Sequence, residues 1–407
     1  MRCGLLGRKL VHSYSPAIHG QLADYSYELF EKEPEELADF LKNGDFTGLN
    51  VTIPYKKDVA ALCDELSERA QKLGAVNTVV KRADGTLIGH NTDYFGFHSL
   101  ILRSGLCVNG KKVLVLGSGG ASATAVCVLQ ELGAVVVVIS RSGENHYNNL
   151  HKHADAAVIV NTTPVGMYPN VGVSPIDLDT FVQLEGVVDV VYNPARTQLL
   201  LDAETRGLVA VNGLWMLVAQ AKESAEWFSS QIIEDSKIAD IHHNLKSQME
   251  NTVLIGMPGC GKSTIGKALA QRLGKKFVDA DVVIEQEAGK CIPEIFKDIG
   301  ESGFRQLESK VLADLGKQSN QVIATGGGCV TRQENYNSLH QNSRIIWIER
   351  EISSLPTEGR PLSHRNFLDE MYQIRKPLYE AFADARYCNS TTLQDIVDMI
   401  MASEASI

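Results

Sequence analysis

The stretch GMPGCGKST, residues Gly256 to Thr264, decides the fold of the C-terminal part of the chain. It follows the apolar run VLI and precedes a helical pattern, which is the context of loops whose backbone amides wrap around phosphate groups. In this pattern Lys262 reaches the β and γ oxygens of a nucleotide, and Ser263 ligates magnesium. The other residues that we expect to hold the nucleotide are Gly256, Gly259, Gly261 and Thr264.

Strand-like and helix-like segments alternate on both sides of this loop and predict a parallel sheet within residues 251–407. The apolar runs NTVLIG, KFVDADVVI, QVIATGGG and RIIWIE alternate with helix-like segments, as expected where crossover helices connect parallel strands. Asp279 and Asp281 stand at the end of the second strand. In phosphoryl transfer one such carboxylate holds magnesium through water and the other orients the attacking hydroxyl. We assign the metal to Asp279 and the hydroxyl to Asp281.

The residues before the loop predict a separate α/β part. Between Gly105 and Val211 short apolar runs alternate with helix-like or polar segments, which again indicates a parallel sheet. A charged, amphipathic stretch without Gly or Pro then predicts a helical connector, with a boundary near residue 245. We expect a substrate-binding domain at 1–100 that is completed by 213–228, a Rossmann-like domain at 101–212, a helical linker at 229–250 and a P-loop domain at 251–407.

The composition argues against several classes of partner. With 39 basic and 49 acidic residues the formal net charge is -10, which disfavours a general affinity for nucleic acids or anionic membranes. The eight cysteines show no zinc-like spacing, so we expect free thiols in a reducing compartment. No stretch approaches the ~18 apolar residues of a membrane span. We therefore expect a cytoplasmic protein that acts on small molecules.

A second glycine-rich turn lies in the N-terminal part. KKVLVLGSGGASATAV places Gly117, Gly119 and Gly120 between a strand and a helix, where backbone amides and the helix dipole bind a pyrophosphate. The next strand ends in SRS, without the acidic residue that would bond a ribose 2′-hydroxyl. Its Arg141 suits a 2′-phosphate, so NADP is favoured over NAD.

Four polar stretches at the ends of elements suit a small hydroxylated carboxylate: HSYSP, GLNVTIPYKK, GAVNTVV and GHNTDYFGF. Where hydride reduces a carbonyl, the nascent alkoxide needs a proton donor, and a lysine paired with an aspartate can hold and deliver that proton. Lys56 and Asp93 are the available pair. A surface ion pair is the alternative interpretation of these two residues.

Together with GSGGA, NTTPVGM, DVVYNPARTQLL and NGLWMLVAQA, these stretches resemble shikimate 5-dehydrogenase in order and spacing over residues 4 to about 228. The resemblance implies that Lys56 and Asp93 carry the proton transfer and that Tyr192 contacts the substrate carboxylate. It implies that shikimate is bound by Ser13, Ser15, Thr52, Asn77, Asp93 and Gln220. It implies that NADP is lined by Gly117, Gly119, Gly120, Ala121, Arg141 and Gly213.

The chain departs from that family in two places. Members of the family usually have the sequence Asn-Arg-Thr where they bind the 2′-phosphate of NADP. This chain has Ser140-Arg141-Ser142 at that place. The segment from Ser142 to Asn161 is also shorter than is usual, as if a crossover helix were trimmed. We expect both departures to affect the affinity and selectivity for the cofactor more than the chemistry.

The C-terminal stretches GESGFRQLE, ATGGGCV, EGRPLS and IRKPLYEAFAD carry three arginines and a glycine turn, which together can clamp a small acid and a transferring phosphoryl group. With the P-loop and Asp281 they resemble shikimate kinase over residues 251 to about 390. The resemblance implies that Arg375 contacts the shikimate carboxylate and that Arg360 lies in a lid over ATP. It implies that shikimate is bound by Asp281, Arg305, Gly327, Gly328 and Arg375.

The two resemblances imply a fusion that reduces 3-dehydroshikimate with NADPH and phosphorylates shikimate with ATP and Mg²⁺. Two alternatives remain at this stage. In one, the N-terminal half senses NADP(H) and only the kinase turns over. In the other, the dehydrogenase prefers quinate and NAD, which the altered Ser140-Arg141-Ser142 loop keeps open.

Overall fold

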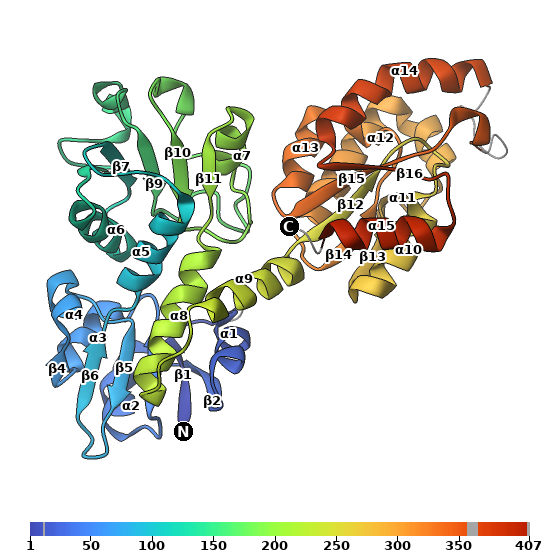
Figure 1. Ribbon diagram of the computed structural model, residues 1–407. Helices are drawn as coiled ribbons and strands as arrows, with labels where there is room; N and C mark the ends of the chain where they lie inside the picture. The colour runs from blue at the N-terminus through green and yellow to red at the C-terminus, as the bar shows by residue number, and fades with distance from the viewer. Residues whose placement is uncertain (11–12, 356–364, 405–407) are drawn as a thin grey trace. The chain divides into compact units, whose positions relative to one another are not determined.

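The computed structural model describes residues 1–10, 13–355 and 365–404, and it separates into two compact units (Figure 1). The first unit comprises Met1–Met167, Val173–Tyr192 and Leu199–Leu245. The second comprises Tyr168–Gly172, Asn193–Gln198 and Lys246–Ile407. Each unit has its own sheets and core and is described by itself.

The first unit begins with a six-stranded sheet in the order β2-β1-β3-β5-β6-β4. Its strands are β1 (Arg2–Gly7), β2 (Ser26–Glu31), β3 (Gly48–Val51), β4 (Glu65–Leu66), β5 (Thr78–Lys81) and β6 (Leu87–His90). Strand β1 runs parallel to β2 and β3, whereas β5 is antiparallel to both β3 and β6. The sheet is therefore mixed, a detail that the alternation of apolar runs did not predict.

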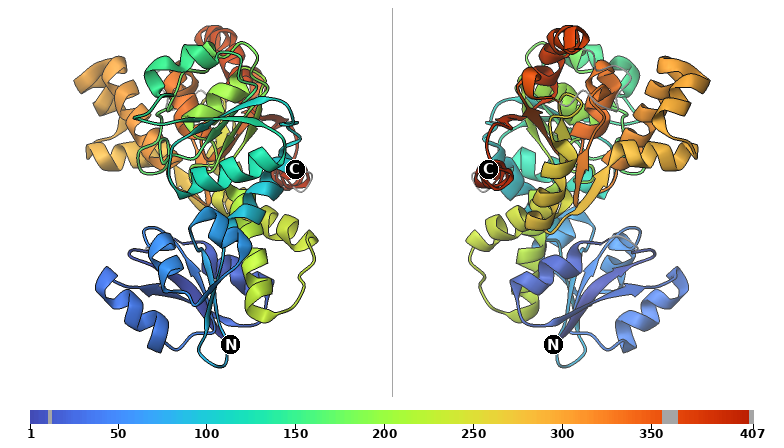
Figure 2. Two further views of the ribbon diagram at one scale, coloured as in Figure 1. Left: turned by 90° about the vertical axis from the view of Figure 1, so that its left-hand side faces the viewer. Right: turned by 90° about the vertical axis from the view of Figure 1, so that its right-hand side faces the viewer.

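Helices cover both faces of this sheet (Figure 2). The helices around it are α1 (Ser15–Leu22), η1 (Pro34–Glu36), α2 (Leu37–Asn43), α3 (Lys56–Leu62) and α4 (Glu68–Leu73). Leu41 of α2, Val59 of α3 and Ala70 of α4 are buried in one cluster with the strand residues Leu49 and Val79. The opposite face receives the long helix α8 (Leu214–Ser229), and this face carries the polar side chains described below.

The second sheet of this unit is parallel throughout, in the order β11-β10-β9-β7-β8, as predicted. Its strands are β7 (Lys112–Leu116), β8 (Val135–Ile139), β9 (Val158–Asn161), β10 (Gly186–Asp189) and β11 (Val209–Val211). Along β7, Val113 and Val115 pack in a cluster with helices α5 (Asp93–Ser104) and α6 (Gly120–Glu131), whereas Leu114 and Leu116 pack in a cluster with α7 (Gln198–Thr205). Because both faces are covered, the strands are almost continuously apolar.

The other helices of the first unit are α5 (Asp93–Ser104), α6 (Gly120–Glu131), α7 (Gln198–Thr205) and α8 (Leu214–Ser229), with the short turns η2 (Tyr147–His153) and η3 (Leu178–Thr180). Helix α9 (Ser236–Met249) begins in the first unit and ends in the second, because the first unit ends at Leu245. Between β8 and β9 the chain forms only the 3₁₀ turn η2. This agrees with the shortened segment seen in the sequence. Helix α9 lies where a helical connector was predicted.

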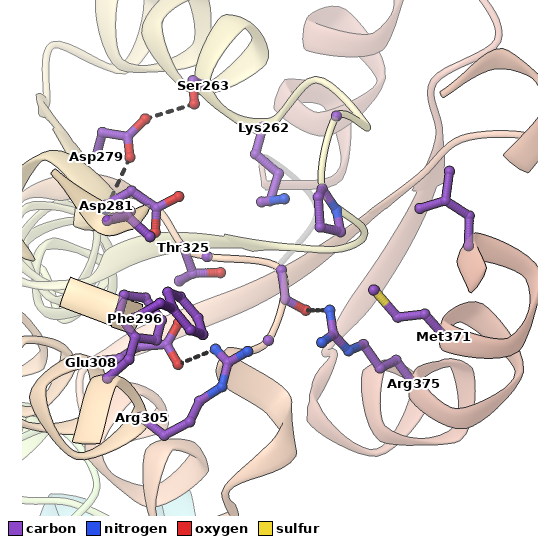
Figure 3. A pocket seen from close by; sticks show the side chains of 18 of the residues that line it. Lys262, Ser263, Asp279, Asp281, Phe296, Arg305, Glu308, Thr325, Met371 and Arg375 are labelled. Carbon is purple, nitrogen blue, oxygen red and sulfur yellow. Dashed lines mark hydrogen bonds and ion pairs between the residues drawn. The ribbon is translucent and has the colours of Figure 1, made fainter. Parts of the chain in front are cut away.

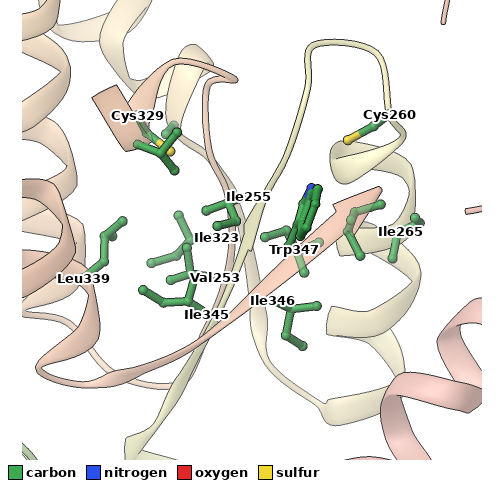
Figure 4. Close-up of a cluster of buried hydrophobic side chains, with 14 of the residues drawn as sticks. Val253, Ile255, Cys260, Ile265, Ile323, Cys329, Leu339, Ile345, Ile346 and Trp347 are labelled. Carbon is green, nitrogen blue, oxygen red and sulfur yellow. The ribbon is translucent and has the colours of Figure 1, made fainter. Parts of the chain in front are cut away.

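The second unit contains a parallel sheet in the order β13-β14-β12-β15-β16. Its strands are β12 (Asn251–Ile255), β13 (Lys276–Asp279), β14 (Gln321–Ala324), β15 (Ser343–Glu349) and β16 (Ala385–Cys388). Its helices are α10 (Lys262–Leu273), α11 (Ala280–Ala288), α12 (Ile292–Gly316), η4 (Cys329–Thr331), α13 (Gln333–His340), η5 (Ile352–Ser354), α14 (Arg365–Phe382) and α15 (Leu393–Glu404). The core is built on the central strands, where Val253, Ile323, Ile345 and Trp347 are at most 1% exposed (Figure 4).

Within the described ranges, no helix is long and apolar enough to cross a bilayer.

Candidate active sites

Lys56 and Asp93 come together at the edge where β3 and β6 end. Lys56 is the first residue of α3 and Asp93 is the first residue of α5. The ammonium nitrogen Nζ donates a hydrogen bond of 2.5 Å to Asp93 Oδ2, and the two side chains are 27% and 17% exposed. A partly buried pair of this kind is less screened than a surface ion pair. It can hold a proton next to a substrate.

Asn77 and Gln220 adjoin this pair. Asn77 Nδ2 donates a hydrogen bond of 3.0 Å to Asp93 Oδ1, and it lies 3.4 Å from Gln220 Oε1. Asn77 Oδ1 accepts a hydrogen bond of 2.7 Å from the backbone N–H of Thr92. Gln220 comes from α8, which is distant in sequence from the other three residues. Four of the predicted site residues therefore form one contiguous group.

The remaining predicted substrate residues lie around the start of α1 and after β3. The backbone N–H of Ser15 donates to Ser13 Oγ at 3.2 Å. Between them Tyr14 packs edge-on against Tyr192, with ring centroids 6.2 Å apart, and burial raises the pKa of both phenols. Both tyrosines therefore act as neutral hydrogen-bonding groups at neutral pH. Thr52 follows β3, and its N–H bonds Leu6 O of the neighbouring strand at 3.0 Å.

Several buried polar residues near this site were not singled out from the sequence. Asn50 is 5% exposed within β3, and its Nδ2 donates to Ser224 Oγ of α8 at 2.8 Å. Thr78 and Thr92 are fully buried beside Ser224. Asn50 was the residue from which this buried polar group could have been predicted, because a side-chain amide inside a buried strand must have hydrogen-bond partners.

The turn after β7 has the features of a pyrophosphate-binding loop. Helix α6 starts directly after Gly119, and no side chain caps its first N–H groups. A side chain at Gly119 or Gly120 would meet open space, so a ligand can approach the backbone there. Gly117 has φ +107°, which favours glycine. Ala121 lies in the first turn of the same helix.

Two other predicted cofactor residues follow strands at opposite edges of this sheet, Arg141 after β8 and Gly213 after β11. Arg141 follows β8 and is exposed, and the preceding Ser140 Oγ donates to Ser142 O. Gly213 precedes α8, where a Cβ would lie 2.0 Å from Val190 O. Arg141 offers the only predicted cation for a 2′-phosphate, and Gly213 allows the close approach of α8 to the loop after β10.

The second unit contains a cavity of about 770 Å³ at the carboxyl ends of its strands (Figure 3). The side chains of Lys262, Arg305 and Arg375 are directed into it. Eleven of the predicted residues line this cavity: Gly259, Gly261, Lys262, Ser263, Thr264, Asp279, Asp281, Arg305, Gly327, Gly328 and Arg375. Gly256 lies at the base of the loop outside the lining, and Arg360 lies outside the described residues.

The phosphate-binding loop is shaped by close backbone contacts. Gly256 has φ +140°, and a Cβ there would lie 2.2 Å from Ile348 O of β15. Lys262 is 8% exposed, and its Nζ donates to the carbonyl oxygens of Gly256 and Met257 at 2.9 and 3.0 Å. The loop therefore curls around the lysine at the start of α10.

Oxygen ligands suited to magnesium stand beside this loop. Ser263 Oγ donates a hydrogen bond of 2.7 Å to Asp279 Oδ2. A hydroxyl and one carboxylate, completed by phosphate oxygens and water, form the typical set for Mg²⁺ in nucleotide sites. Asp281 lies two residues further on, at the start of α11. Burial, reinforced by the charge of Asp279, raises its pKa to about 6.

Two arginines are fixed on the opposite side of the cavity. Arg305 donates a hydrogen bond of 2.7 Å to Glu308, whose side chain is 1% exposed. A Cβ at Gly328 would lie 2.2 Å from the Arg305 guanidinium, so a side chain there would displace the guanidinium from its present position. Arg375 donates to Gly327 O at 3.2 Å. Glu308 was not predicted, although its spacing of three residues from Arg305 on a helix places the two side chains together.

Known proteins are similar in sequence to more than half of this chain. A shikimate dehydrogenase (NADP(+)) of Clostridium perfringens is 35% identical over 265 residues, which cover 60% of this chain and 97% of that protein. The chain belongs to the shikimate dehydrogenase family. The shikimate dehydrogenase substrate binding domain matches residues 5–79, and shikimate kinase matches residues 258–403.

Solved structures agree with this family. A chorismate mutase/shikimate 5-dehydrogenase fusion protein from Clostridium acetobutylicum is 37% identical with a TM-score of 0.58, and the match covers 60% of this chain and 97% of that one. Shikimate 5-dehydrogenase of Thermus thermophilus, solved in complex with NADP(H) and shikimate, is 32% identical with a TM-score of 0.55, and the match covers 60% of this chain and 99% of that one. In this chain a dehydrogenase unit therefore precedes a shikimate kinase domain.

Proposed function

We propose that this chain catalyses two consecutive reactions of the shikimate pathway. The first unit reduces 3-dehydroshikimate to shikimate with NADPH, and the second transfers a phosphoryl group from ATP to the 3-hydroxyl of shikimate. The observation that carries the proposal is the presence, on one chain, of a shikimate dehydrogenase relative and of a shikimate kinase match at residues 258–403. The product of the first unit is thus the substrate of the second.

In the dehydrogenase unit, bound NADPH supplies the hydride for the ketone carbon. The Lys56 ammonium delivers the proton to the ketone oxygen, and Asp93, 2.5 Å away, holds the ammonium in place. Asn77 and Gln220 bind the hydroxyl groups beside this pair. Ser13, Ser15, Thr52 and Tyr192 hold the remainder of the substrate, including its carboxylate. The turn at Gly117, Gly119 and Gly120 receives the pyrophosphate of the cofactor.

In the kinase unit, Asp281 accepts a hydrogen bond from the substrate hydroxyl and orients it toward the γ-phosphate. Lys262 and the loop amides bind the phosphates, and Ser263 with Asp279 would hold Mg²⁺, which neutralises developing charge when it is bound. Arg305 and Arg375 bind the carboxylate of shikimate. The proposed role of Arg360 as a lid residue rests on the family resemblance alone.

The two alternative functions are not favoured. A silent NADP(H)-sensing module would have no need for a partly buried lysine and aspartate held at 2.5 Å. The curated relatives at 34–38% identity carry the name shikimate dehydrogenase (NADP(+)), which supports shikimate and NADP over quinate and NAD. Rates with each pair of substrate and cofactor would separate the two preferences.

A single-tube assay tests the proposal. The purified chain is supplied with 3-dehydroshikimate, NADPH, ATP and Mg²⁺, while nicotinamide absorbance and shikimate 3-phosphate are followed separately. We expect NADPH consumption and phosphorylated product. If NADPH is not consumed while added shikimate is phosphorylated, the assignment of the first unit is wrong. If shikimate accumulates without phosphorylation, the assignment of the second unit is wrong.

A further inference from the structure

Three buried hydroxyl groups form a triangle behind the Lys56–Asp93 pair. Thr78 of β5, Thr92 before α5 and Ser224 of α8 are all 0% exposed. Their hydroxyl oxygens are separated by 2.8 Å for Thr78 and Ser224, 2.9 Å for Thr92 and Ser224, and 3.2 Å for Thr78 and Thr92. We call this group the hydroxyl triangle. It joins a strand and two helices at one point.

The triangle makes directional contacts that an apolar cluster could not make. Burying a hydroxyl costs free energy unless its hydrogen bonds are satisfied. Small apolar residues would fill the same space without that cost. The polar choice therefore points to a requirement for orientation at this place, and the contacts of the triangle show which group is oriented.

That group is the side-chain amide of Asn77. Its Oδ1 accepts hydrogen bonds from the N–H of Thr92 at 2.7 Å and from Thr78 Oγ1 at 3.2 Å. The Nδ2 group donates to Thr92 Oγ1 of the triangle and to Asp93 Oδ1, each 3.0 Å away. The triangle therefore holds both ends of the amide while its nitrogen bonds Asp93. Asp93 Oδ2 is then left to accept from Lys56. The rotation of the Asn77 amide thus fixes the rotation of the Asp93 carboxylate.

The triangle is itself anchored from its far side. Asn50 Nδ2 donates to Ser224 Oγ at 2.8 Å and lies 3.3 Å from Thr78 Oγ1. Asn50 Oδ1 accepts a hydrogen bond of 2.7 Å from the phenol of Tyr27. Burial raises the pKa of Tyr27 well above its usual range, so the phenol remains a neutral donor.

We propose that Thr78 is a positioning residue for the dehydrogenase reaction. Its hydroxyl contacts neither Lys56 nor Asp93, and it acts through the Asn77 amide. A chain of hydrogen bonds runs from Tyr27 through Asn50 and the triangle to Asn77 and Asp93. This inference rests on the proposed dehydrogenase activity and adds a residue to it that the family resemblance did not assign.

Two variants of the full-length chain test the role of the hydroxyl. Thr78→Val keeps the branched shape and removes the oxygen, whereas Thr78→Ser keeps the oxygen and removes a methyl group. For Thr78→Val we expect kcat of shikimate oxidation with NADP to fall about ten- to hundredfold, because a misplaced catalytic group loses rate steeply. For Thr78→Ser we expect kcat within about twofold of the original chain.

A purely structural role would not change the proton-transfer step. In Thr78→Val we expect a larger solvent deuterium isotope effect on kcat, because transfer of the proton from the substrate hydroxyl to Lys56 becomes slower than hydride transfer. The kinase rate of the same samples should be unchanged. If Thr78→Val does not fold, as judged by its thermal transition, Ser224→Ala removes another corner of the triangle, and the same fall in kcat is expected.

The outcomes separate this inference from the function on which it rests. If the original chain neither oxidises shikimate nor reduces 3-dehydroshikimate, the proposed function is wrong. If the original chain is active and Thr78→Val is as active as Thr78→Ser, with an unchanged isotope effect, the positioning role is wrong and the dehydrogenase assignment stands. Equal losses in both variants would also contradict it, because they would assign the effect to packing.

Discussion

Lys56 Nζ and Asp93 Oδ2 lie 2.5 Å apart although the two residues are separated by 37 positions in the chain. Each is the first residue of a helix, Lys56 of α3 and Asp93 of α5. A helix N-terminus favours the aspartate and disfavours the lysine, so the carboxylate offsets an electrostatic cost at the start of α3. The pair is therefore a consequence of bringing two helix starts to one sheet edge.

Replacing Lys56 by Ala should abolish most dehydrogenase activity and leave the kinase intact. Lys56 is the general acid in the reduction and, by microscopic reversibility, the general base in the oxidation of shikimate. Loss of such a group typically costs about 10²–10⁴ in rate, and we expect a fall in kcat for shikimate oxidation within that range. Lys57→Ala is the matched control, because Lys57 is the next residue and its side chain is exposed. Equal rates for Lys56→Ala and Lys57→Ala would remove Lys56 from the chemistry.

Replacing Lys262 by Ala should abolish most kinase activity and leave the dehydrogenase intact. The buried ammonium of Lys262, at the start of α10, is positioned to bind the phosphoryl group that is transferred. Because its positive charge is lost in Lys262→Ala, we expect shikimate phosphorylation to fall at least about a hundredfold. Reduction of 3-dehydroshikimate should continue at its original rate. Lys267→Ala, at an exposed position of the same helix, serves as the control. Phosphorylation that survives in Lys262→Ala would contradict the assignment of the loop.

Gly256→Ala should disable the kinase through the backbone. A Cβ at this position would lie 2.2 Å from Ile348 O, and φ is +140°. Strain and a forced shift of β15 should together cost at least about 2 kcal/mol of unfolding free energy. Gly274→Ala at the end of α10 also has a positive φ, but its Cβ would meet open space, so about 1–2 kcal/mol is expected. Urea unfolding of both variants compares the two costs, and equal losses would exclude the steric explanation.

The parallel sheets could be predicted from the sequence because their central strands are buried on both faces. Runs such as those ending at Leu116 and Val160 are continuously apolar, and such runs are typical of parallel strands. The phosphate-binding loop could be predicted because its backbone conformation requires glycine at fixed positions of the sequence. Gly256 and Gly261 both have positive φ angles, and few other residues tolerate them.

The polar interior of the first unit could not be predicted in this way. The contact of Thr78 with Ser224 spans 146 positions, and that of Asn50 with Ser224 spans 174. No local period encodes such pairs, because each residue looks like an ordinary strand or helix residue in its own segment. The antiparallel pairing of β5 and β6 was missed for a similar reason. Both strands lie in or near short polar stretches that were interpreted as element ends.

Glu223 of α8 should make the stability of the dehydrogenase unit depend on pH. Burial raises its pKa to about 7 from an ordinary value of 4.5, and the charge of Glu226 adds to this rise. The positive charges of Arg69, which lies 3.1 Å from Glu223, and of Lys222 oppose the rise. Because the fold favours the protonated acid, unfolding free energy is highest below pH 4.5 and falls as the pH rises through about 7. The difference of about 2.5 pKa units corresponds to about 3 kcal/mol. The free energy of unfolding of Glu223→Gln should therefore equal that of the original chain near pH 4.5 and exceed it by up to about 3 kcal/mol at pH 8. Urea unfolding, followed by the fluorescence of Trp215 and Trp227, measures this difference. An equal difference at both pH values would show that the carboxyl group does not titrate between them.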